Sequence, residues 1–382
     1  MTTKKEKEWQ QVIFDEVIEH SAFGPRFSGD HYADDGNVVT LRTTDISESG
    51  EISYGTTPRA NLNENKFIDH FLKIGDLVIT RSGRVGTAAV FAGHAEPVLP
   101  GAFLIRFRLR GNANPYFYRY YFNSKNGRQR LLSVSRGAAQ QNINVTNVRT
   151  LRVPCPTRPQ QDAIVSFLST YDDLIENSRR RIELLEEAAR QLYKEWFVRF
   201  RFPGHEHVKI IDGVPEGWTR KALRSVLTLN YGKALKADDR REGPYPVFGS
   251  SGNVGSHDKP LVKGPGIVLG RKGNVGSVYW VHEDFWPIDT VYFINAEESD
   301  YFTYFALLAT PFISTDVAVP GLNRDFAYSR EIVIPSATQR GAFVEAVSPL
   351  FAQAKTLKAY CAKLQEARDL LLPKLMSGEI AA

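Results

Sequence analysis

Two long amphipathic segments with the same heptad pattern constrain the fold of this chain more than any other feature. In both segments apolar residues recur at alternating steps of four and three, as they do along the seam of a coiled coil. The first seam contains Ile164, Leu168, Ile175, Ile182, Leu185 and Leu192, and the second contains Phe343, Leu350, Leu357, Leu364 and Leu371. One shift in residue number superposes the two patterns, so the segments are two copies of one helical unit.

Each copy predicts a helix of roughly 35 to 40 residues, which is about 55 Å long at about 1.5 Å per residue. A helix of that length leaves much of its apolar stripe uncovered if it lies only on its own domain, so we predict that the two helices pack together. If a pseudo-two-fold axis relates the halves, the pair is an antiparallel coiled coil. Arg368 interrupts the seam and is expected to mark fraying, and Pro349 is expected to kink the second helix.

The regions outside the helices repeat as well. Residues 76–86 (Asp-Leu-Val-Ile-Thr-Arg-Ser-Gly-Arg-Val-Gly) match residues 266–276 (Gly-Ile-Val-Leu-Gly-Arg-Lys-Gly-Asn-Val-Gly). Both predict a buried strand followed by an Arg-x-Gly-x-Val-Gly loop, in which the glycines allow positive φ and close approach to a phosphate group. An ordinary hairpin turn is the alternative interpretation, but retention of the arginine in both copies favours a function.

A third match lies near the end of each copy. Asn142 and Pro154 are as far apart in the sequence as Asn323 and Pro335. Each proline is expected to close a short apolar strand just before the long helix begins. We therefore align Asn142 with Asn323.

These patterns together predict an α+β fold with a pseudo-two-fold internal repeat. Two similar mixed α/β domains are separated by two long helices packed as an antiparallel coiled coil. The expected boundaries are 1–156 for the first domain, 157–200 for the central helix, 201–336 for a linker and the second domain, and 337–382 for the C-terminal helix.

The charge is distributed unequally between the two copies. Between Leu77 and Arg152 there are eleven arginines and one lysine against a single acid, Glu96. Such a stretch repels itself unless an anion neutralises it, and guanidinium groups favour bidentate contact with phosphate and guanine. Residues 264–335 instead contain four basic and nine acidic residues, so the second domain is expected to use another surface. The Gly- and Ser-rich run 249–255 is expected to be a flexible loop near that surface.

The composition, with 42% hydrophobic and 24% charged residues, is that of a globular protein. The sequence has no apolar run of membrane-spanning length and no apolar leader at the N-terminus, so we expect a cytoplasmic protein that does not bind a membrane. Its two cysteines, Cys155 and Cys361, are too few for a disulfide framework and lack metal-ligand spacing. We therefore expect reduced thiols and no metal site.

Motifs that would indicate an enzyme are missing from the sequence. It has no P-loop, no His-Glu-x-x-His motif and no Gly-x-Ser-x-Gly elbow. Asn114-Pro-Tyr116 partly matches the Asn-Pro-Pro-Tyr of adenine methyltransferases but lacks the second proline, and Pro115 fits the first turn of a helix. We therefore predict a non-catalytic protein in which the aromatic residues 116–122 form a core face rather than a base-stacking surface.

With these features the chain resembles the specificity subunit of a Type I restriction-modification system. The resemblance rests on the Pro-x-Gly-Trp opening at 215–218, the Pro159-Gln-Gln start of the central helix, its Glu195-Trp-Phe197 exit and the terminal Leu372-Pro-Lys-Leu-Met-Ser-Gly-Glu-Ile380. It extends over nearly the full length of the chain.

The resemblance implies that each domain is a target-recognition domain that reads one half of a bipartite, asymmetric site in double-stranded DNA. The helices are expected to set the spacing between the half-sites and to dock two methyltransferase (modification) subunits, which restriction (translocase) subunits join. S-adenosylmethionine, ATP and Mg²⁺ are then cofactors of the partner subunits, and no cofactor is expected in this chain.

Candidate DNA contacts lie on two loops of each domain. In the first domain they are Arg81, Ser82 and Arg84 on the glycine loop, and Arg136, Gln140, Gln141 and Asn142 on the second loop. In the second domain they are Arg271, Lys272, Asn274, Asn323 and Arg324. Most arginine and lysine side chains are expected to hold phosphates, whereas glutamine and asparagine can pair bidentately with adenine.

Two other functions remain compatible with the sequence. The chain could be the specificity subunit of a methylation-only or other defence complex, or it could be a scaffold whose coiled coil dimerises without DNA. A scaffold has no need of eleven arginines beside one acid, and this charge favours a DNA-binding protein.

Overall fold

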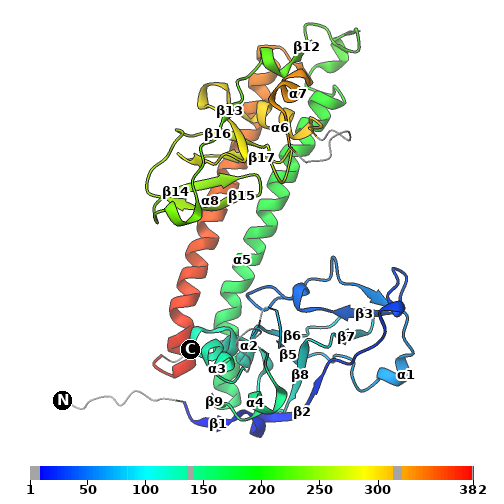
Figure 1. The fold of residues 1–382 in the computed structure, drawn as a ribbon, viewed down its shortest axis with the longest axis vertical. Coiled ribbons are helices and arrows are strands. Elements are labelled where there is room, and N and C mark those ends of the chain that lie inside the picture. Colours follow the sequence, from blue (N-terminus) through cyan, green and yellow to red (C-terminus); the bar gives the residue numbers. More distant parts are fainter. Residues whose placement is uncertain (1–8, 84, 136–141, 313–320, 381) are drawn as a thin grey trace, which may run out of the picture. The chain divides into compact units, whose positions relative to one another are not determined.

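The structure is a computed structural model and describes residues 9–83, 85–135, 142–312, 321–380 and 382. The chain forms two compact units, one of Met1–Asn177 with Tyr360–Ala382 and the other of Ser178–Ala359. Each unit contains one mixed α/β domain and a stretch of both long helices (Figure 1).

The first unit contains nine described strands and four short helices. The strands are β1 (Gln11–Ile13), β2 (Ile18–Phe23), β3 (Val38–Leu41), β4 (Arg59–Ala60), β5 (Leu77–Thr80), β6 (Ala88–Val90), β7 (Val98–Pro100), β8 (Leu104–Leu109) and β9 (Arg152–Pro154). The helices are α1 (Glu64–Phe67), α2 (Pro115–Asn123), α3 (Lys125–Ser133) and α4 (Val145–Arg149). An antiparallel sheet has the order β2-β8-β5-β6, a second sheet has the order β4-β3-β7 with β3 and β7 parallel, and β1 pairs with β9.

Strand β5 lies inside the first unit, and all four of its residues are buried. Because side chains alternate across a strand, Leu77 and Ile79 join one apolar cluster and Val78 joins another. Helix α2 packs in the first of these clusters through Phe117 and Tyr118, which are fully buried. The prediction that the aromatic residues 116–122 form a core face is therefore confirmed.

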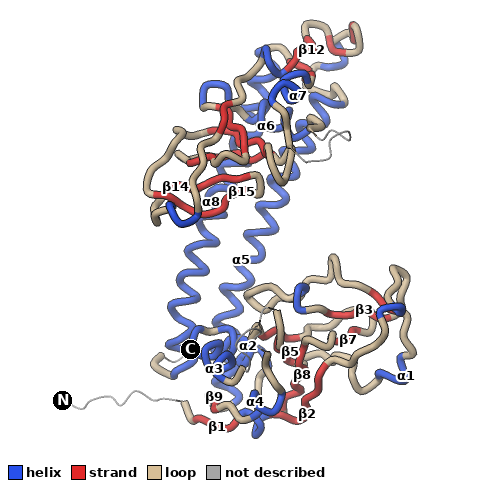
Figure 2. Tube along the Cα trace, viewed as in Figure 1, coloured by secondary structure: helices blue, strands red, loops and turns tan. Residues whose placement is uncertain are grey.

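The second unit repeats this arrangement. Its strands are β10 (Ile210–Ile211), β11 (Val214–Pro215), β12 (Thr219–Ala222), β13 (Asn230–Tyr231), β14 (Tyr245–Gly249), β15 (Gly252–His257), β16 (Gly266–Gly270), β17 (Val278–Val281), β18 (Trp286–Pro287), β19 (Val291–Ile294) and β20 (Glu331–Ile334). Its short helices are α6 (Tyr301–Ala309) and α7 (Arg324–Ser329). The order β13-β19-β16-β17 corresponds to β2-β8-β5-β6, the order β15-β14-β18 corresponds to β4-β3-β7, and β12-β20 corresponds to β1-β9. The predicted internal repeat is therefore present, with β10-β11 as an added hairpin. Figure 2 colours the helices and strands of each unit.

The Gly- and Ser-rich run 249–255 is not the flexible loop that its composition predicted. Strands β14 and β15 form a hairpin across it, with Gly249 opposite Gly252 in the antiparallel register. Gly252 takes a φ of 94°, which permits the tight turn between the strands. The glycines therefore serve a strand connection.

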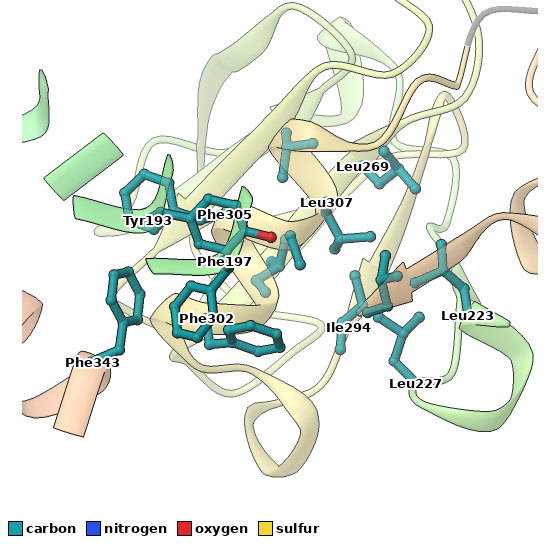
Figure 3. Packing of buried hydrophobic residues seen from close by; sticks show 14 of the residues in the cluster. Tyr193, Phe197, Leu223, Leu227, Leu269, Ile294, Phe302, Phe305, Leu307 and Phe343 are labelled. Atoms are coloured by element: carbon teal, nitrogen blue, oxygen red, sulfur yellow. The ribbon is translucent and has the colours of Figure 1, made fainter. Parts of the chain in front are cut away.

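Aromatic side chains from three helices meet in the core of the second unit (Figure 3). Phe302 and Phe305 come from α6, Tyr193 and Phe197 come from the central helix, and Phe343 comes from the C-terminal helix. The rings of Phe197 and Phe343 meet edge to face with their centroids 5.0 Å apart. The ends of both long helices are thus part of a domain core.

The long helices are α5 (Arg158–Tyr193), which continues into a π-helical turn at Lys194–Val198, and α8 (Ala337–Ser377). Within the first unit, Asp172 of α5 contacts Arg368 of α8, and Ile175 contacts Cys361. Numbers rise along α5 as they fall along α8, so the two helices pack antiparallel, as predicted. Helix α8 continues through Pro349, where we expected a kink.

Among the described residues, only those in the middle of the predicted seam pack helix against helix without joining a domain core. Ile182, Ala354 and Leu357 form a small cluster in the second unit, against which Leu185 packs. Other seam residues pack into the domain cores: Ile164, Leu168 and Leu371 in the first unit, and Leu192, Phe343 and Leu350 in the second. Ile175 and Leu364 are also buried. The heptads therefore serve two purposes, because the helix ends anchor the domains.

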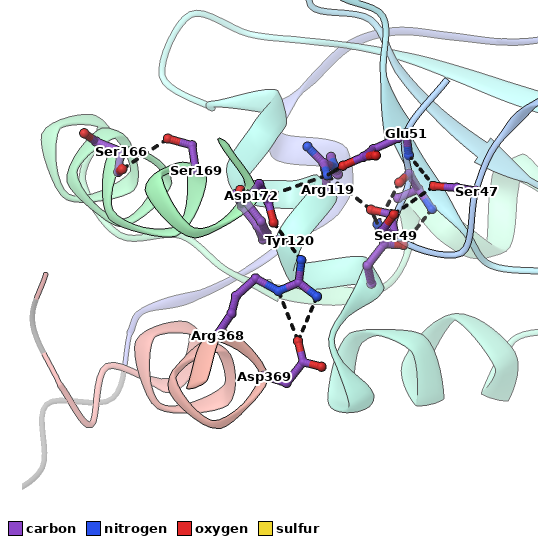
Figure 4. A network of polar contacts seen from close by, with 12 residues as sticks. Ser47, Ser49, Glu51, Arg119, Tyr120, Ser166, Ser169, Asp172, Arg368 and Asp369 are labelled. Carbon is purple, nitrogen blue, oxygen red and sulfur yellow. Dashed lines mark hydrogen bonds and ion pairs between the residues drawn. The ribbon is translucent and has the colours of Figure 1, made fainter. Parts of the chain in front are cut away.

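Arg368 does not mark fraying. Its Nη1 donates to Oδ1 of Asp172 at 2.6 Å, and Asp172 also accepts a hydrogen bond from the hydroxyl of Tyr120 at 2.5 Å (Figure 4). The Asp172 carboxylate lies 3.6 Å from Arg119 as well. An arginine on an apolar seam is stable here because its charge is paired.

The start of each long helix is tied to the N-cap residue of a domain helix. Oε1 of Gln161 accepts a hydrogen bond from the backbone N–H of Asn114, which caps α2. In the second unit, Nε of Arg340 donates to Oδ2 of Asp300, which caps α6. These contacts fix each domain on its own stretch of helix.

Among the described residues, no helix combines the length and the apolar composition needed to cross a bilayer.

Candidate nucleic-acid interface

The glycines of the two predicted loops have the same backbone conformation. The loops follow β5 and β16 at residues 81–86 and 271–276. Gly83 and Gly86 take φ values of 74° and 84°, and Gly273 and Gly276 both take 80°. In each loop the N–H of the last glycine donates back to the end of the strand, with an N to O distance of 2.8 Å for Gly86 and 3.0 Å for Gly276. Both loops are thus compact turns that hold one arginine at their start.

In the first unit, Arg81 joins the two loops that the sequence predicted separately. Its guanidinium lies over the ring of Phe23 with its carbon 4.5 Å from the ring centroid, and its Nε donates to Oδ1 of Asn142 at 3.0 Å. The backbone N–H of Ile143 donates to the carbonyl oxygen of Arg81 at 3.1 Å. Arg81, Phe23 and Asn142 line one hollow together with Asn144. The structure therefore brings Arg81 and Asn142 together.

The second unit repeats this contact with a second arginine added. The guanidinium carbon of Arg271 lies 5.0 Å from the ring centroid of Tyr231, and that of Arg324 lies 4.8 Å from the same ring. The N–H of Leu322 donates to the carbonyl oxygen of Arg271 at 2.7 Å. Arg271, Tyr231 and Arg324 thus form one cationic and aromatic surface patch.

The aromatic partners Phe23 and Tyr231 were missed by the sequence analysis. They occupy the same register, since Phe23 pairs with Ile105 in β8 and Tyr231 pairs with Tyr292 in β19. Each is partly exposed, by 37% and 49% respectively. A sequence signal exists, because each aromatic residue directly precedes a glycine in the same place of the repeat.

Three other predicted residues lie on the glycine loops. Ser82 is half-buried, whereas Lys272 and Asn274 are exposed. The side-chain nitrogen of Asn274 lies 3.5 Å from Oγ of Ser251. Lys272 and Asn274 are therefore open to an approaching ligand.

The alignment of Asn142 with Asn323 is wrong. Oδ1 of Asn323 accepts the N–H of Asp325 at 2.7 Å and so caps α7, while the residue that caps α4 is Asn144, which accepts the N–H of Thr146 at 3.2 Å. Asn144 and Asn323 are related by the same shift as the long helices. The side-chain oxygen of Asn323 is thus occupied by a helix cap, which makes it a poor base reader. Sequence spacing misled us because a second Asn and a second Pro lie two residues further along the first copy.

Four predicted contacts of the first domain lie outside the described residues. They are Arg84, Arg136, Gln140 and Gln141. Their roles stay predictions.

Three arginines of the arginine-rich stretch, Arg108, Arg119 and Arg149, lie beside acids from outside that stretch. Arg108 donates to both carboxylate oxygens of Asp76 at 2.9 and 2.8 Å, and this hydrogen-bonded pairing raises the pKa of Arg108. Arg149 pairs with Asp15, and Arg119 lies near Asp172. These acids relieve part of the self-repulsion that we expected for this stretch.

Arg106 is almost completely buried and also has a structural role. It donates to the carbonyl oxygens of Asp69 and Phe71 at 2.9 and 3.2 Å. Burial lowers the pKa of its guanidinium, because the charged form loses its hydration.

Asn114 also has a structural role, since its amide donates to Asp162 and its side-chain oxygen accepts the N–H of Tyr116. Within the described part of the chain, no group of three or more His, Cys, Asp or Glu residues is placed to hold a metal ion.

Two similar domains, each with an arginine stacked on an aromatic ring beside a glycine loop, define a protein with two related recognition modules on paired long helices. The chain belongs to the Type I restriction modification DNA specificity domain family, whose profile matches residues 6–187 and 215–355.

Curated relatives and a solved structure are similar to this chain. It is 26% identical over 205 residues to the Type I restriction enzyme MjaIX specificity subunit of Methanocaldococcus jannaschii, a match that covers 52% of this chain and 46% of that protein. It is 28% identical over 166 residues to the putative type I restriction enzyme MjaX specificity subunit of the same organism, covering 41% and 39%. The chain thus matches less than half the length of each relative.

The fold is similar to the crystal structure of the Type-I restriction-modification system S subunit from M. genitalium. The TM-score is 0.61 at 18% sequence identity, and the match covers 98% of each chain. This likeness supports the arrangement of two α/β domains with two long helices packed together.

Proposed function

We propose that this chain is the DNA specificity subunit of a Type I restriction-modification complex, in which each domain reads one half of a split, asymmetric site in double-stranded DNA. The observation that carries the proposal is the repeated contact of Arg81 with Phe23 and of Arg271 with Tyr231 beside matching glycine loops. Two related but unequal copies of one surface suit a site with two unequal halves.

The chemistry of this surface fits DNA. A guanidinium held on an aromatic ring keeps its outward N–H groups available, and those groups match phosphate oxygens and the guanine edge. The exposed side chains of Lys272 and Asn274 add a cation and an amide on the second glycine loop. In the first domain, Asn142 presents an amide beside Arg81. Contacts to phosphate position the domain, and contacts to base edges select the sequence.

We assign the long helices to spacing and docking. Several large apolar side chains on α5 and α8 remain exposed, which suits a surface that a partner covers: Phe167, Leu174, Leu184, Tyr360 and Leu370. The proposed partners are two methyltransferase subunits, with restriction subunits in addition. S-adenosylmethionine, ATP and Mg²⁺ would be cofactors bound by those partners.

Comparison of DNA methylation in a host with and without this gene tests the proposal. We expect one split adenine-methylation motif to disappear on deletion and to return when the chain is restored. If every methylation motif persists after the deletion, the proposal is contradicted and a scaffold that does not bind DNA is favoured. DNA cleavage assays on the purified assembly then separate a restriction complex from one that only methylates.

A further inference from the structure

A second turn lies directly beside each glycine loop. We call residues 101–103 and 288–290 the companion turns. The N–H of Arg81 donates to the carbonyl oxygen of Phe103 at 2.9 Å, and the N–H of Arg271 donates to that of Thr290 at 2.9 Å. The glycine loop and the companion turn are thus joined by the same backbone hydrogen bond in both units.

The companion turns are held in place by equivalent contacts. The N–H of Gly101 donates to the carbonyl oxygen of Leu41 at 2.8 Å, and the N–H of Ile288 donates to that of Phe248 at 2.9 Å. Each turn follows a proline that ends the strand, β7 in the first unit and β18 in the second. The two turns therefore present residues from the same backbone positions.

The glycine that follows each stacked aromatic residue allows this close approach. A Cβ on Gly24 would lie 2.1 Å from the carbonyl oxygen of Gly101, and one on Gly232 would lie 2.0 Å from that of Ile288. Both copies thus keep a glycine where the companion turn crosses the strand. The framework of the surface is shared.

The side chains at the tip of the turn are not shared. In these aligned positions Ala102 corresponds to Asp289 and Phe103 to Thr290. Phe103 is 57% exposed and lines a hollow together with Thr43 and Arg42. Asp289 is also exposed, although it lies next to the stacked Arg271, whose Nη1 donates to its backbone oxygen at 3.3 Å. The framework is the same in the two domains, and the exposed tip differs.

The chemistry of the two tips suits different bases. A large exposed apolar side chain fits the 5-methyl group of thymine in the major groove, whereas a carboxylate can accept a hydrogen bond from the amino group of cytosine. A carboxylate is repelled by phosphate, so an acid on this surface suits a base edge and not the DNA backbone. The arginines common to both domains suit the backbone, which has the same charge in every sequence.

We propose that the companion turns determine which base pair each domain reads: Phe103 contacts the methyl group of a thymine in one half-site, and Asp289 accepts from the amino group of a cytosine in the other. This inference rests on the proposed function. Arg81 and Arg271 hold phosphates beside these positions and do not select the sequence.

The test uses the full chain assembled with its methyltransferase subunits. The motif of the unaltered assembly is first mapped, and methylation rates are then compared on DNA sites in which each motif position is changed singly. Phe103→Asn is expected to lower the preference at one A·T position of one half-site about tenfold, whereas Phe103→Leu keeps it. Asp289→Asn is expected to lower the preference at one C·G position of the other half-site by a similar factor.

The matched controls are exposed residues beside β5 and β19, at the ends of these strands that lie away from the glycine loop and the companion turn. Ile74→Ala, at a residue 77% exposed before β5, and Glu297→Gln, after β19, are expected to leave every preference unchanged. Equal preferences in Phe103→Asn, Phe103→Leu and the unaltered assembly would overturn the inference and leave the proposed function intact. Absence of any split motif with the unaltered assembly would instead reject the proposed function, and this inference with it.

Discussion

Arg368 of α8 and Asp172 of α5 form a nearly buried ion pair within the first unit, with a distance of 2.6 Å between Nη1 and Oδ1. Their side chains are 18% and 12% exposed. The shift that relates the two helices places Ala189 and Phe351 at the equivalent positions of the second unit, and both are buried and apolar. The helix pair is therefore charged in one unit and apolar in the other at equivalent points of the repeat.

Removing the carboxylate of this pair should destabilise the protein strongly. Asp172→Ala leaves Arg368 paired only with the exposed Asp369 and removes the acceptor of the Tyr120 hydroxyl, at an expected cost of about 3 kcal/mol. Thermal unfolding followed by circular dichroism should show a lower melting temperature than that of the unaltered protein. Glu187→Ala, which breaks an exposed pair with Arg190 on the same helix, is the matched control and should lower the melting temperature far less, because solvent screens an exposed ion pair. Equal melting of the two variants would show that the buried pair adds nothing.

A partly buried tyrosine makes the stability of the protein depend on alkaline pH. Burial, with a smaller contribution from Glu186, raises the pKa of Tyr304 to about 12 from its ordinary value of 10.0. Between these values the unfolded chain loses the proton and the folded chain keeps it, so stability is complete below about pH 10 and falls as the pH rises. Urea unfolding across this range should show a shallower decline in Tyr304→Phe. Identical slopes for the two proteins would contradict the assignment.

Loss of the stacked arginine should weaken DNA binding in a salt-dependent way. Arg81→Ala is expected to lower the affinity of the assembly and to reduce the slope of log K against log salt by about one, because one phosphate contact is lost. Fluorescence anisotropy with a duplex that contains the mapped motif measures both quantities. Arg190→Ala removes an exposed arginine of α5 and should leave the slope unchanged. A slope unaffected by Arg81→Ala would remove this loop from the interface.

A methyl group at Gly24 should disturb the companion turn. Its Cβ would overlap backbone oxygens, so Gly24→Ala should destabilise the first domain by about 1 to 3 kcal/mol. Gly29→Ala is the control, since a Cβ there meets nothing within 4 Å. Thermal unfolding of both variants provides the comparison, and unchanged melting of Gly24→Ala would show that the turn can move aside.

Lengthening the central helix α5 should change the distance between the two half-sites in the DNA. Four residues inserted near Ser178 add about 6 Å at about 1.5 Å per residue. The mapped motif should then gain one or two base pairs of spacing while both half-sites stay the same, because the domains are not altered. Unchanged spacing in an assembly that still methylates would reject the helices as a spacer.

The sequence by itself determined the elements that depend on local periodicity. Heptads such as Ile175 to Ile182 predicted the paired helices, and the repeated glycine loops predicted two similar domains, because these patterns follow from residues close together in the chain. The aromatic core face of α2 also follows this logic, whereas the order of the strands in the sheets was not predicted.

Only the tertiary structure decided which polar residues are free. Arg108, Arg119 and Arg149 seemed available for an anion until the fold placed acids from distant parts of the chain beside them. In the same way the fold assigned Asn323 to a helix cap and brought Phe23 beneath Arg81. Charge pairing and stacking depend on distance in space, which a linear pattern does not contain, so the candidate site was decided by tertiary packing although its loops were visible in the sequence.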